Sequence, residues 1–396
     1  FGRAWLYIAH ESQVPNPGDF FCTYLGRQPV VVSRHTDGKI YVLFNRCAHR
    51  GVKVCNRTSG NVKRFQCMYH GWTYRTDGTL EAVSLKDGYP ADFDFNSGEF
   101  GMLQVPRMES YRGFVFASAS PEGPTLESFL AKVKTSIDDL VDRAPEGELD
   151  LTAGAHRYIV RANWKVQLEN INDLYHPPFA HASTVRADGR QFGRRGGDKG
   201  SQARITKTDG SLISYFDEAG TWAFDYGHSY CGPLLFEEER SDPVYLEYKA
   251  MLEQQYGPER TREVLKLTRH NSIFYPNMAI QSLAQNVRVI RPLSVDRTEV
   301  TVYPVLFKRA PKQFNQHLVR FLNLTHGAAA PIQADDIEVF KRAQHGFMVE
   351  RAEWILLARG RGEETPVEGG GRKGSGTSEL VQRNQYRAWL QYMEGA

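Results

Sequence analysis

Long apolar runs are missing from this 396-residue sequence, and none approaches the ~18 residues that a membrane-spanning helix needs. We therefore expect no membrane helix. A strong charge of one sign is also missing, because 49 basic residues balance 46 acidic ones. The net charge of +3 is too small to indicate a nucleic acid or an anionic membrane as a partner.

Cysteine is scarce, with five residues in the whole chain. An odd number in a chain of this size argues against a disulfide scaffold and for a reducing cytoplasm, where metal binding is the better use of a cysteine. The sequence also has no internal repeat and no glycine-rich fingerprint of a dinucleotide or flavin site. It begins at Phe1 without a signal-like segment, so a natural N-terminus upstream of this numbering is compatible with it.

What is present is the composition of a globular protein, with 41% hydrophobic and 24% charged residues. The length predicts two domains. Short β-like runs such as PVVVSR, IYVLF and GFVFAS alternate with turn signals between residues 20 and 120, which predicts an all-β domain over residues 1–124. From Leu126 to Val141 apolar residues recur at helical spacing, so a second domain is expected over residues 125–396.

The second domain is expected to mix helices with an antiparallel sheet, which gives an α+β fold. Apolar spacing predicts a helix from Asn163 to Tyr175 that ends before two prolines, and strand-like runs follow at residues 279–307. The last quarter is typical of helices, except for the stretch VEGGGRKGSGTS, which predicts a loop. The glycine-rich, basic segment from Arg186 to Gly210 predicts an exposed mobile loop.

Two loops near the N-terminus each combine one cysteine with one histidine. Cys47, His49, Cys67 and His70 form the pattern Cys-x-His-x17-Cys-x2-His. Structural zinc accepts the same four ligands, but its usual spacing pairs cysteine with cysteine and histidine with histidine. A Rieske [2Fe–2S] cluster needs two thiolates on one iron and two imidazoles on the other, which the mixed loops supply. Unrelated core residues are the third interpretation.

Residues beside these loops fit the cluster interpretation. Gly51 and Gly71 follow the two histidines and suit tight loops that fold over a cluster. Trp72 would shield the cluster from solvent. Cys55 breaks the spacing and is expected to be a small buried apolar residue with no part in the site.

A second group of candidate ligands lies in ENINDLYHPPFAH. His176 and His181 are five residues apart, and the prolines between them break the helix so that both imidazoles can face one ion. Two histidines and one carboxylate form the facial triad of non-haem Fe(II) oxygenases. Asp335 and Asp336 are the candidate acids, although a cap and first-turn charge of a helix explain such acids equally well. Asp173 is either a surface acid or a carboxylate that orients a histidine ligand.

These motifs together resemble the catalytic α subunits of Rieske non-haem iron aromatic-ring-hydroxylating oxygenases. The resemblance runs over nearly the whole chain, through WLYIAHESQVPNPGDF, NRCAHRG, CMYHGWTY and ANWKVQLENINDLYH to the C-terminal helices. It implies an N-terminal Rieske domain and a helix-wrapped antiparallel-sheet domain around mononuclear iron. It also implies that four residues hold the cluster, namely Cys47, His49, Cys67 and His70.

The resemblance assigns roles in the second domain as well. It implies that His176, His181 and Asp336, rather than Asp335, hold the iron, and that Asn170 lies near it. Asp173 matches the aspartate that links an iron histidine to a cluster histidine of a neighbouring subunit. That match implies a ring-shaped homotrimer, possible β subunits, and electrons from NADH delivered by a separate reductase, with or without a ferredoxin.

The substrate follows from a looser part of the resemblance. The stretches DDIEVFKRAQHG and TSELVQRNQYRAWLQYM are similar to those of oxygenases for benzoate, anthranilate, salicylate or terephthalate. Arg288 would suit the carboxylate of such a substrate by bidentate pairing, and a structural role explains it equally well. The expected reaction is cis-dihydroxylation of an aromatic acid by dioxygen. The alternatives are a monooxygenase or O-demethylase, and a Rieske electron carrier without oxygenase activity.

Overall fold

The computed structural model divides the chain into two compact units, Phe1–Leu126 and Glu127–Ala396. It describes residues 1–182, 211–233, 240–266 and 269–394. The segment expected to form a mobile loop, Arg186 to Gly210, lies outside the described residues. None of the described helices is both long enough and apolar enough to cross a membrane.

The first unit is all-β, as expected from its alternating apolar runs. Three antiparallel sheets have the strand orders β4-β3-β2-β5, β1-β10-β9 and β6-β7-β8. The strands are β1 Leu6–His10, β2 Asp19–Leu25, β3 Gln28–Arg34, β4 Ile40–Phe44, β5 Ser59–Asn61, β6 Phe65–Gln66, β7 Thr73–Tyr74, β8 Leu80–Ala82, β9 Arg107–Tyr111 and β10 Phe114–Ser118.

One apolar core of this unit surrounds the two cysteine and histidine loops. Phe20, Leu43 and Tyr74 are almost fully buried there, and the side chains of Cys47 and Cys67 belong to the same cluster. Burial of these apolar side chains stabilises the loops, because each loop is attached to strands that the core holds together.

The second unit is built on a nine-stranded antiparallel sheet, which confirms the expected fold class. Its order is β12-β18-β17-β16-β15-β14-β13-β21-β20. The strands are β12 His156–Val160, β13 Thr221–Ala223, β14 Ser229–Cys231, β15 Asn271–Phe274, β16 Met278–Gln281, β17 Asn286–Ser294, β18 Arg297–Pro304, β20 Thr365–Pro366 and β21 Arg372–Gly374; β11 Leu149–Asp150 pairs separately with β19 Leu306–Phe307.

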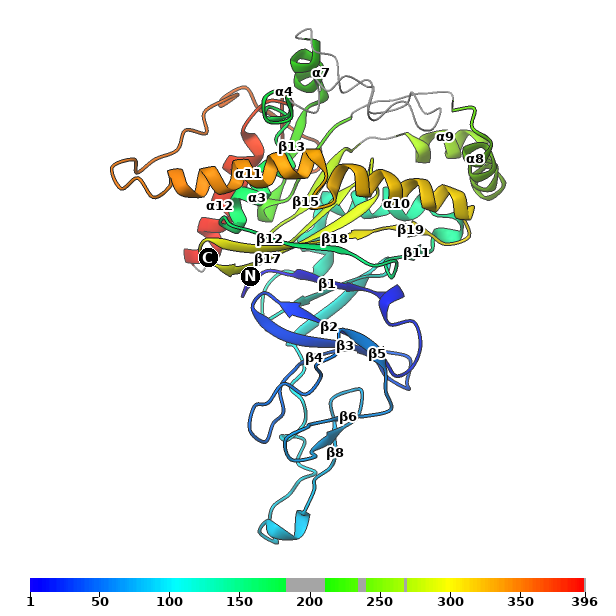
Figure 1. Cartoon of the computed structure of the whole chain (residues 1–396), viewed down its shortest axis with the longest axis vertical. Coiled ribbons are helices and arrows are strands. Elements are labelled where there is room, and N and C mark those ends of the chain that lie inside the picture. The colour runs from blue at the N-terminus through cyan, green and yellow to red at the C-terminus, as the bar shows by residue number, and fades with distance from the viewer. Residues whose placement is uncertain (183–210, 234–239, 267–268, 395–396) are drawn as a thin grey trace. The chain divides into compact units, whose positions relative to one another are not determined.

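Helices pack on this sheet (Figure 1). They are α1 Leu126–Leu130, α2 Thr135–Asp142, α3 Trp164–Ile171, α4 Pro177–Ala180, α7 Ser211–Ala219, α8 Pro243–Tyr256, α9 Pro258–Leu265, α10 Lys312–His326, α11 Pro331–Gly346 and α12 Leu380–Glu394. Leu322 of α10 and Phe340 of α11 pack against Val300 and Val302 of β18. Leu168 of α3 packs against strands of the same sheet. These contacts fix the helices that carry the candidate iron ligands.

Two local expectations are wrong. Helix α3 ends at Ile171 and not at Tyr175, because the chain turns at Asp173, whose carboxylate accepts the backbone N–H groups of Tyr175 and His176. The stretch VEGGGRKGSGTS is not simply a loop, because Arg372–Gly374 pairs with β13 as strand β21. The glycine-rich sequence has no strand-like pattern of its own, and pairing with β13 is what stabilises the extended conformation.

Candidate cluster and iron sites

The first cysteine and histidine loop is closed by two backbone hydrogen bonds. The N–H of Cys47 donates to the carbonyl of Val52 at 2.8 Å, and the N–H of Gly51 donates to the carbonyl of Cys47 at 2.9 Å. Gly51 has a φ of +73°, a conformation that costs a residue with a side chain free energy. The glycine is therefore required by the turn.

The second loop repeats this geometry. The N–H of Cys67 donates to the carbonyl of Trp72 at 2.8 Å, the N–H of Gly71 donates to the carbonyl of Cys67 at 3.0 Å, and Gly71 has a φ of +70°. The two loops thus have the same shape, although their histidines stand at different offsets from the cysteine.

The four candidate cluster ligands fit a [2Fe–2S] group. Both cysteines are buried, and the ring centroids of His49 and His70 are 4.7 Å apart. The Nδ1 of His49 is buried and has no hydrogen-bond partner among the described residues, as expected of an atom that serves as a ligand. Trp72 stacks on His49 with ring centroids 5.0 Å apart and covers it, as the sequence predicts.

Tyr74 is a part of this site that sequence reasoning missed. Its hydroxyl accepts the N–H of Ala48 at 3.1 Å and lies 3.1 Å from the Sγ of Cys47. Burial raises the pKa of Tyr74, so the phenol keeps its proton and can donate it to a thiolate. Hydrogen bonds to cluster sulfurs are one of the factors that set the reduction potential. The motif CMYHGWTY contains this tyrosine, but its spacing alone does not reveal the contact.

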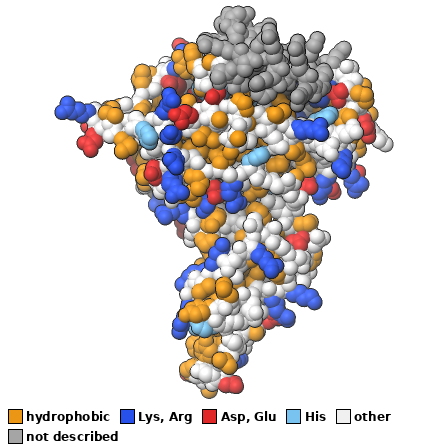
Figure 2. Space-filling model, in the orientation of Figure 1, with side chains coloured by type: hydrophobic (Ala, Val, Ile, Leu, Met, Phe, Trp, Pro, Cys, Tyr) orange, Lys and Arg blue, Asp and Glu red, His pale blue; other side chains and the backbone are white. Residues whose placement is uncertain are grey.

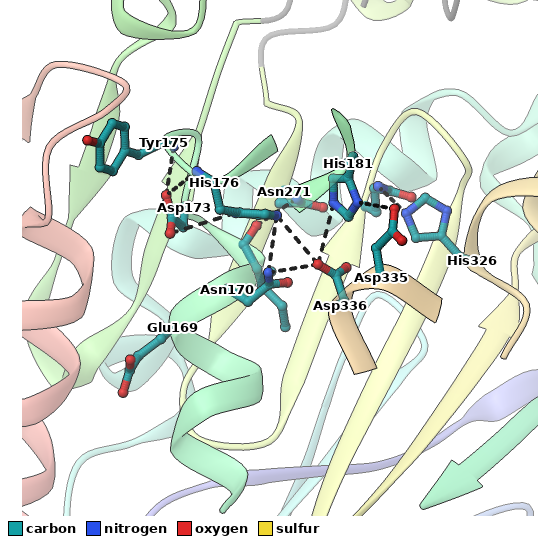
Figure 3. Close-up of polar contacts among 12 residues, drawn as sticks. Glu169, Asn170, Asp173, Tyr175, His176, His181, Asn271, His326, Asp335 and Asp336 are labelled. Carbon is teal, nitrogen blue, oxygen red and sulfur yellow. Dashed lines mark hydrogen bonds and ion pairs between the residues drawn. The ribbon is translucent and has the colours of Figure 1, made fainter. Parts of the chain in front are cut away.

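His176, His181 and Asp336 come together in the second unit (Figure 3). One ligand atom from each lies within 4.8 Å of the others. The Oδ1 of Asp336 is 3.6 Å from the Nε2 of His176 and 3.4 Å from the Nε2 of His181. Two imidazoles and one carboxylate that occupy one face of a metal ion form the donor set of a facial iron triad.

The chain between Asp173 and His181 explains how both imidazoles reach this point. The Oδ1 of Asp173 accepts the N–H groups of Tyr175 at 2.7 Å and of His176 at 3.2 Å. Pro177 then begins the short helix α4, where its missing N–H costs nothing, and His181 follows the helix end. The ring centroids of the two histidines are 5.2 Å apart as a result.

Each histidine faces a second carboxylate through its other ring nitrogen. The Nδ1 of His176 is 3.7 Å from the Oδ2 of Asp173, and the Nδ1 of His181 is 3.5 Å from the Oδ2 of Asp335 (Figure 3). A carboxylate in this position favours the tautomer with the proton on Nδ1, which leaves the Nε2 lone pair for a metal ion, although at 3.7 Å the Nδ1 of His176 makes no hydrogen bond to Asp173. The two neighbouring aspartates therefore have different positions, with Asp336 inside the triad and Asp335 behind His181.

Burial and nearby charge act differently on the two imidazoles. Burial by itself would lower the pKa of His176, but the neighbouring carboxylates of Asp173 and Asp336 outweigh it and raise that pKa. For His181 burial dominates, so its pKa is lowered despite the nearby charge of Asp336. The site therefore gathers negative charge that a divalent cation would neutralise.

Asn170 lies between two of the ligand atoms. Its Nδ2 is 3.1 Å from the Nε2 of His176 and donates to the Oδ1 of Asp336 at 3.1 Å. Asn170 therefore contacts two of the three candidate iron ligands, and its role there stays a prediction. It holds the histidine and the aspartate at a fixed separation.

Arg288 lies on β17, and its side chain is 5% exposed. Its Nε donates to the Oδ1 of Asn286 at 3.4 Å. Among the described residues no carboxylate lies within ion-pair distance of its guanidinium, although burial lowers the pKa of Arg288 and the charge of Asp336 acts against this. The charge of this arginine is therefore not matched by a contacting acid in the described part of the chain.

Comparisons with known proteins agree with both sites. The model of the catalytic domain of ring-hydroxylating α subunits matches residues 148–395, and the model of the Rieske [2Fe–2S] domain matches residues 4–90. The chain belongs to the ring-hydroxylating oxygenase α subunits. The expected Rieske cluster, mononuclear iron and terminal oxygenase class are thereby confirmed. The zinc interpretation and the electron-carrier interpretation are wrong.

Named relatives extend the match over most of the chain. The large subunit of 2-halobenzoate 1,2-dioxygenase from Burkholderia cepacia is 34% identical, over 91% of this chain and 76% of that protein. Toluate 1,2-dioxygenase subunit alpha from Pseudomonas putida is also 34% identical, over 88% of this chain and 74% of that protein. The solved structure of naphthalene 1,2-dioxygenase with indole bound has a TM-score of 0.82 and 26% identity, and covers 99% of this chain and 87% of that chain.

The different positions of the two neighbouring aspartates lead to a prediction about metal binding. Asp336→Ala removes an oxygen from inside the triad, so the purified protein should lose its mononuclear iron and keep the visible absorption of the cluster. Asp335→Ala leaves the triad complete and should retain most of the iron. Iron content and visible spectra check both variants. If Asp335→Ala loses its iron and Asp336→Ala does not, Asp335 is the ligand.

Proposed function

We propose that this ring-hydroxylating α subunit cis-dihydroxylates an aromatic acid with dioxygen. The two relatives described above are named for halobenzoate and toluate, both of which are aromatic carboxylates. The observation that carries the proposal is Arg288, a buried cation on β17 without a contacting acid among the described residues.

The energetics of Arg288 favour an anionic substrate. Removing an unpaired charge from water costs several kcal/mol, and a buried cation is therefore expected to acquire a partner. Asp336 is the carboxylate whose charge acts on it, after the Tyr158 hydroxyl, and a bound metal ion would neutralise that charge. A carboxylate on the substrate ring would pair with the planar guanidinium through two parallel hydrogen bonds.

The roles of the chain's own residues follow from their positions. A cluster bound in the first unit would supply single electrons, and an iron ion held in the second unit would supply the chemistry that activates dioxygen. His176, His181 and Asp336 hold the iron, and Asn170 sets the separation of two of these ligands. Arg288 fixes the acid group, so that the ring can turn only about the bond that joins it to the carboxylate.

Electron delivery involves partners outside this chain. NADH supplies the electrons through a separate reductase, with or without a ferredoxin. The α subunits form a ring-shaped trimer, possibly with β subunits, in which Asp173 of one copy connects to a cluster histidine of the next. A role at an interface agrees with the exposure of Asp173, whose side chain is 29% exposed.

Exposed apolar side chains on and near the second cluster loop support docking of another protein there. Figure 2 shows apolar side chains on the surface of the first unit. Met68 is 78% exposed, Tyr69 is 56% exposed and Leu85 is 90% exposed. Exposed apolar groups in one region commonly mark a protein contact. A cytoplasmic location is consistent with the five cysteines, all of which are free thiols.

Asp173 offers a direct test of the proposed bridge between subunits. Asp173→Asn keeps the size of the side chain but removes its charge, so turnover should fall by ~10–100-fold or more while both metals stay bound and the cluster stays reducible. Asp296→Asn, which changes an exposed turn, is the control and should turn over normally. Full activity of Asp173→Asn would contradict the bridge.

Arg288 offers the test of the substrate class. Arg288→Met replaces the cation with an apolar chain of similar length, which is commonly tolerated in a protein core. The affinity for benzoate should fall by ~10–100-fold, because a charge-assisted pair is lost, while the affinity for toluene should stay within about twofold. Binding is measured by titration calorimetry without oxygen.

Arg291→Met is the matched control for this experiment. Arg291 lies on the same strand, but its guanidinium already pairs with Glu299 at 3.1 Å. The control should bind benzoate as the wild type does. Unchanged benzoate affinity in Arg288→Met would assign Arg288 a purely structural role.

A further inference from the structure

A row of polar side chains runs from Arg288 across the sheet. In the antiparallel register Asn286 of β17 stands opposite Gln281 of β16, and Arg288 stands opposite Ala279. Directly paired residues point to the same face of a sheet, so all four side chains share one face. Ala279 is buried in one apolar cluster with Leu168 and Ile171 of α3, so Arg288 shares the face of the sheet on which α3 packs.

Hydrogen bonds connect this row in one direction. The Nε of Arg288 donates to the Oδ1 of Asn286 at 3.4 Å, and the Nδ2 of Asn286 donates to the Oε1 of Gln281 at 2.9 Å. The Nε2 of Gln281 then lies 2.9 Å from the Nε2 of His326, at the end of α10. Asn286 and Gln281 are buried, so these bonds are shielded from competing water.

The far end of the row fixes the state of His326. The hydroxyl of Thr325 donates to the carbonyl of Phe321 at 2.8 Å, so it must accept the proton from the Nδ1 of His326, 2.6 Å away. The Nε2 of His326 then carries a lone pair and accepts from Gln281. Burial lowers the pKa of His326 well below its usual value, and the charge of Arg288 lowers it further, so this neutral form is retained.

The same bonds fix the amide of Gln281. The oxygen of Gln281 faces the N–H of Asn286, and its nitrogen faces the lone pair of His326. A flipped amide would therefore place a donor against a donor and an acceptor against an acceptor. The nitrogen carries two N–H groups, and only one of them is used by His326. The second N–H makes no hydrogen bond to a described residue, although Gln281 is only 4% exposed, and the Oδ1 of Asn271 opposite it is also buried without a partner. A buried donor without a partner costs ~1–3 kcal/mol, which a bound acceptor would recover.

This row lies next to the iron site. Asn271 of β15 stands opposite Gln281, and its Nδ2 donates to the carbonyl of Ile171 at 2.7 Å, at the end of the helix that carries Asn170. Figure 3 draws His326 in the same close-up as His181 and Asp335, whose Nδ1 and Oδ2 atoms lie 3.5 Å apart. Arg288 and Gln281 therefore lie on the face of the sheet that contacts the helix carrying Asn170, and an aromatic acid held by Arg288 would lie on that face as well.

We propose that Gln281 is a specificity-determining residue whose second N–H donates to the carboxylate of the aromatic acid, with His326 as the positioning residue that orients the Gln281 amide. This inference rests on the proposed function, since it takes the anion bound by Arg288 as the substrate. A carboxylate has enough lone pairs to accept from the guanidinium and the amide together. A neutral arene of the same shape, such as toluene, accepts from neither and leaves the buried amide unpaired.

Gln281→Met tests the first part, because methionine matches the length of glutamine and lacks the donor. The whole protein with its metals is titrated with benzoate and with toluene in the absence of oxygen. The benzoate dissociation constant should rise by ~10-fold, and toluene should bind as tightly as before or more tightly. Gln382→Met is a control for removal of a buried glutamine elsewhere, since Gln382 bonds to the carbonyl of Glu169, and it should leave the ratio of the two affinities unchanged.

The outcomes separate this inference from the proposed function. If Arg288→Met weakens benzoate binding and Gln281→Met does not, the substrate class stands and the role of Gln281 is overturned. If the wild type does not bind benzoate more tightly than toluene, both are overturned.

Two substitutions of His326 test the positioning role independently. His326→Phe removes the acceptor that orients Gln281, so the preference for benzoate over toluene should fall and KM for benzoate should rise, with kcat at saturation little changed. His326→Gln supplies an amide oxygen as an acceptor and should restore the preference. An unchanged preference in His326→Phe, or an equal loss in both variants, would overturn the positioning role.

Discussion

The convergence of His176, His181 and Asp336 on one point is the constraint on which the catalytic unit depends. Asp173 and Asp335 lie behind His176 and His181, so both imidazoles direct Nε2 toward Asp336. These partners favour the tautomer with the proton on Nδ1 and restrict the orientation of each ring, which supports the donor set that His176, His181 and Asp336 form. The acids also concentrate negative charge in a largely buried site, which makes it a strong site for a divalent metal ion.

The fold supplies these contacts from distant parts of the chain. The break after α3, the start of α4 and the first half of α11 each contribute one portion of the site, and the nine-stranded sheet holds the helices through the packing of Leu322 and Phe340. In the first unit, two loops of the same shape each supply a buried cysteine and a histidine, which suit a [2Fe–2S] cluster. The site for electron storage and the site for oxygen chemistry thus lie in separate structural units of one chain.

Sequence predicted the parts of this arrangement that are local. The mixed cysteine and histidine loops, the histidines on either side of two prolines and the acidic pair were all visible as spacings. Contacts between distant residues were not visible: Tyr74 beside Cys47, Asp335 behind His181, and the bond from Gln281 to His326 depend on packing that no short motif encodes. Strand β21 was missed for the same reason, and α3 was predicted too long because the turn made by Asp173 overrode apolar spacing.

The most direct test of the account is a single turnover by the chemically reduced protein with benzoate and ¹⁸O-labelled dioxygen, followed by mass analysis of the product. If the two metal sites and the acid-binding side chains work as argued, the product is a cis-diol of the ring that carries two labelled oxygen atoms. A product with one labelled atom, or consumption of dioxygen with benzoate recovered intact, would contradict the account.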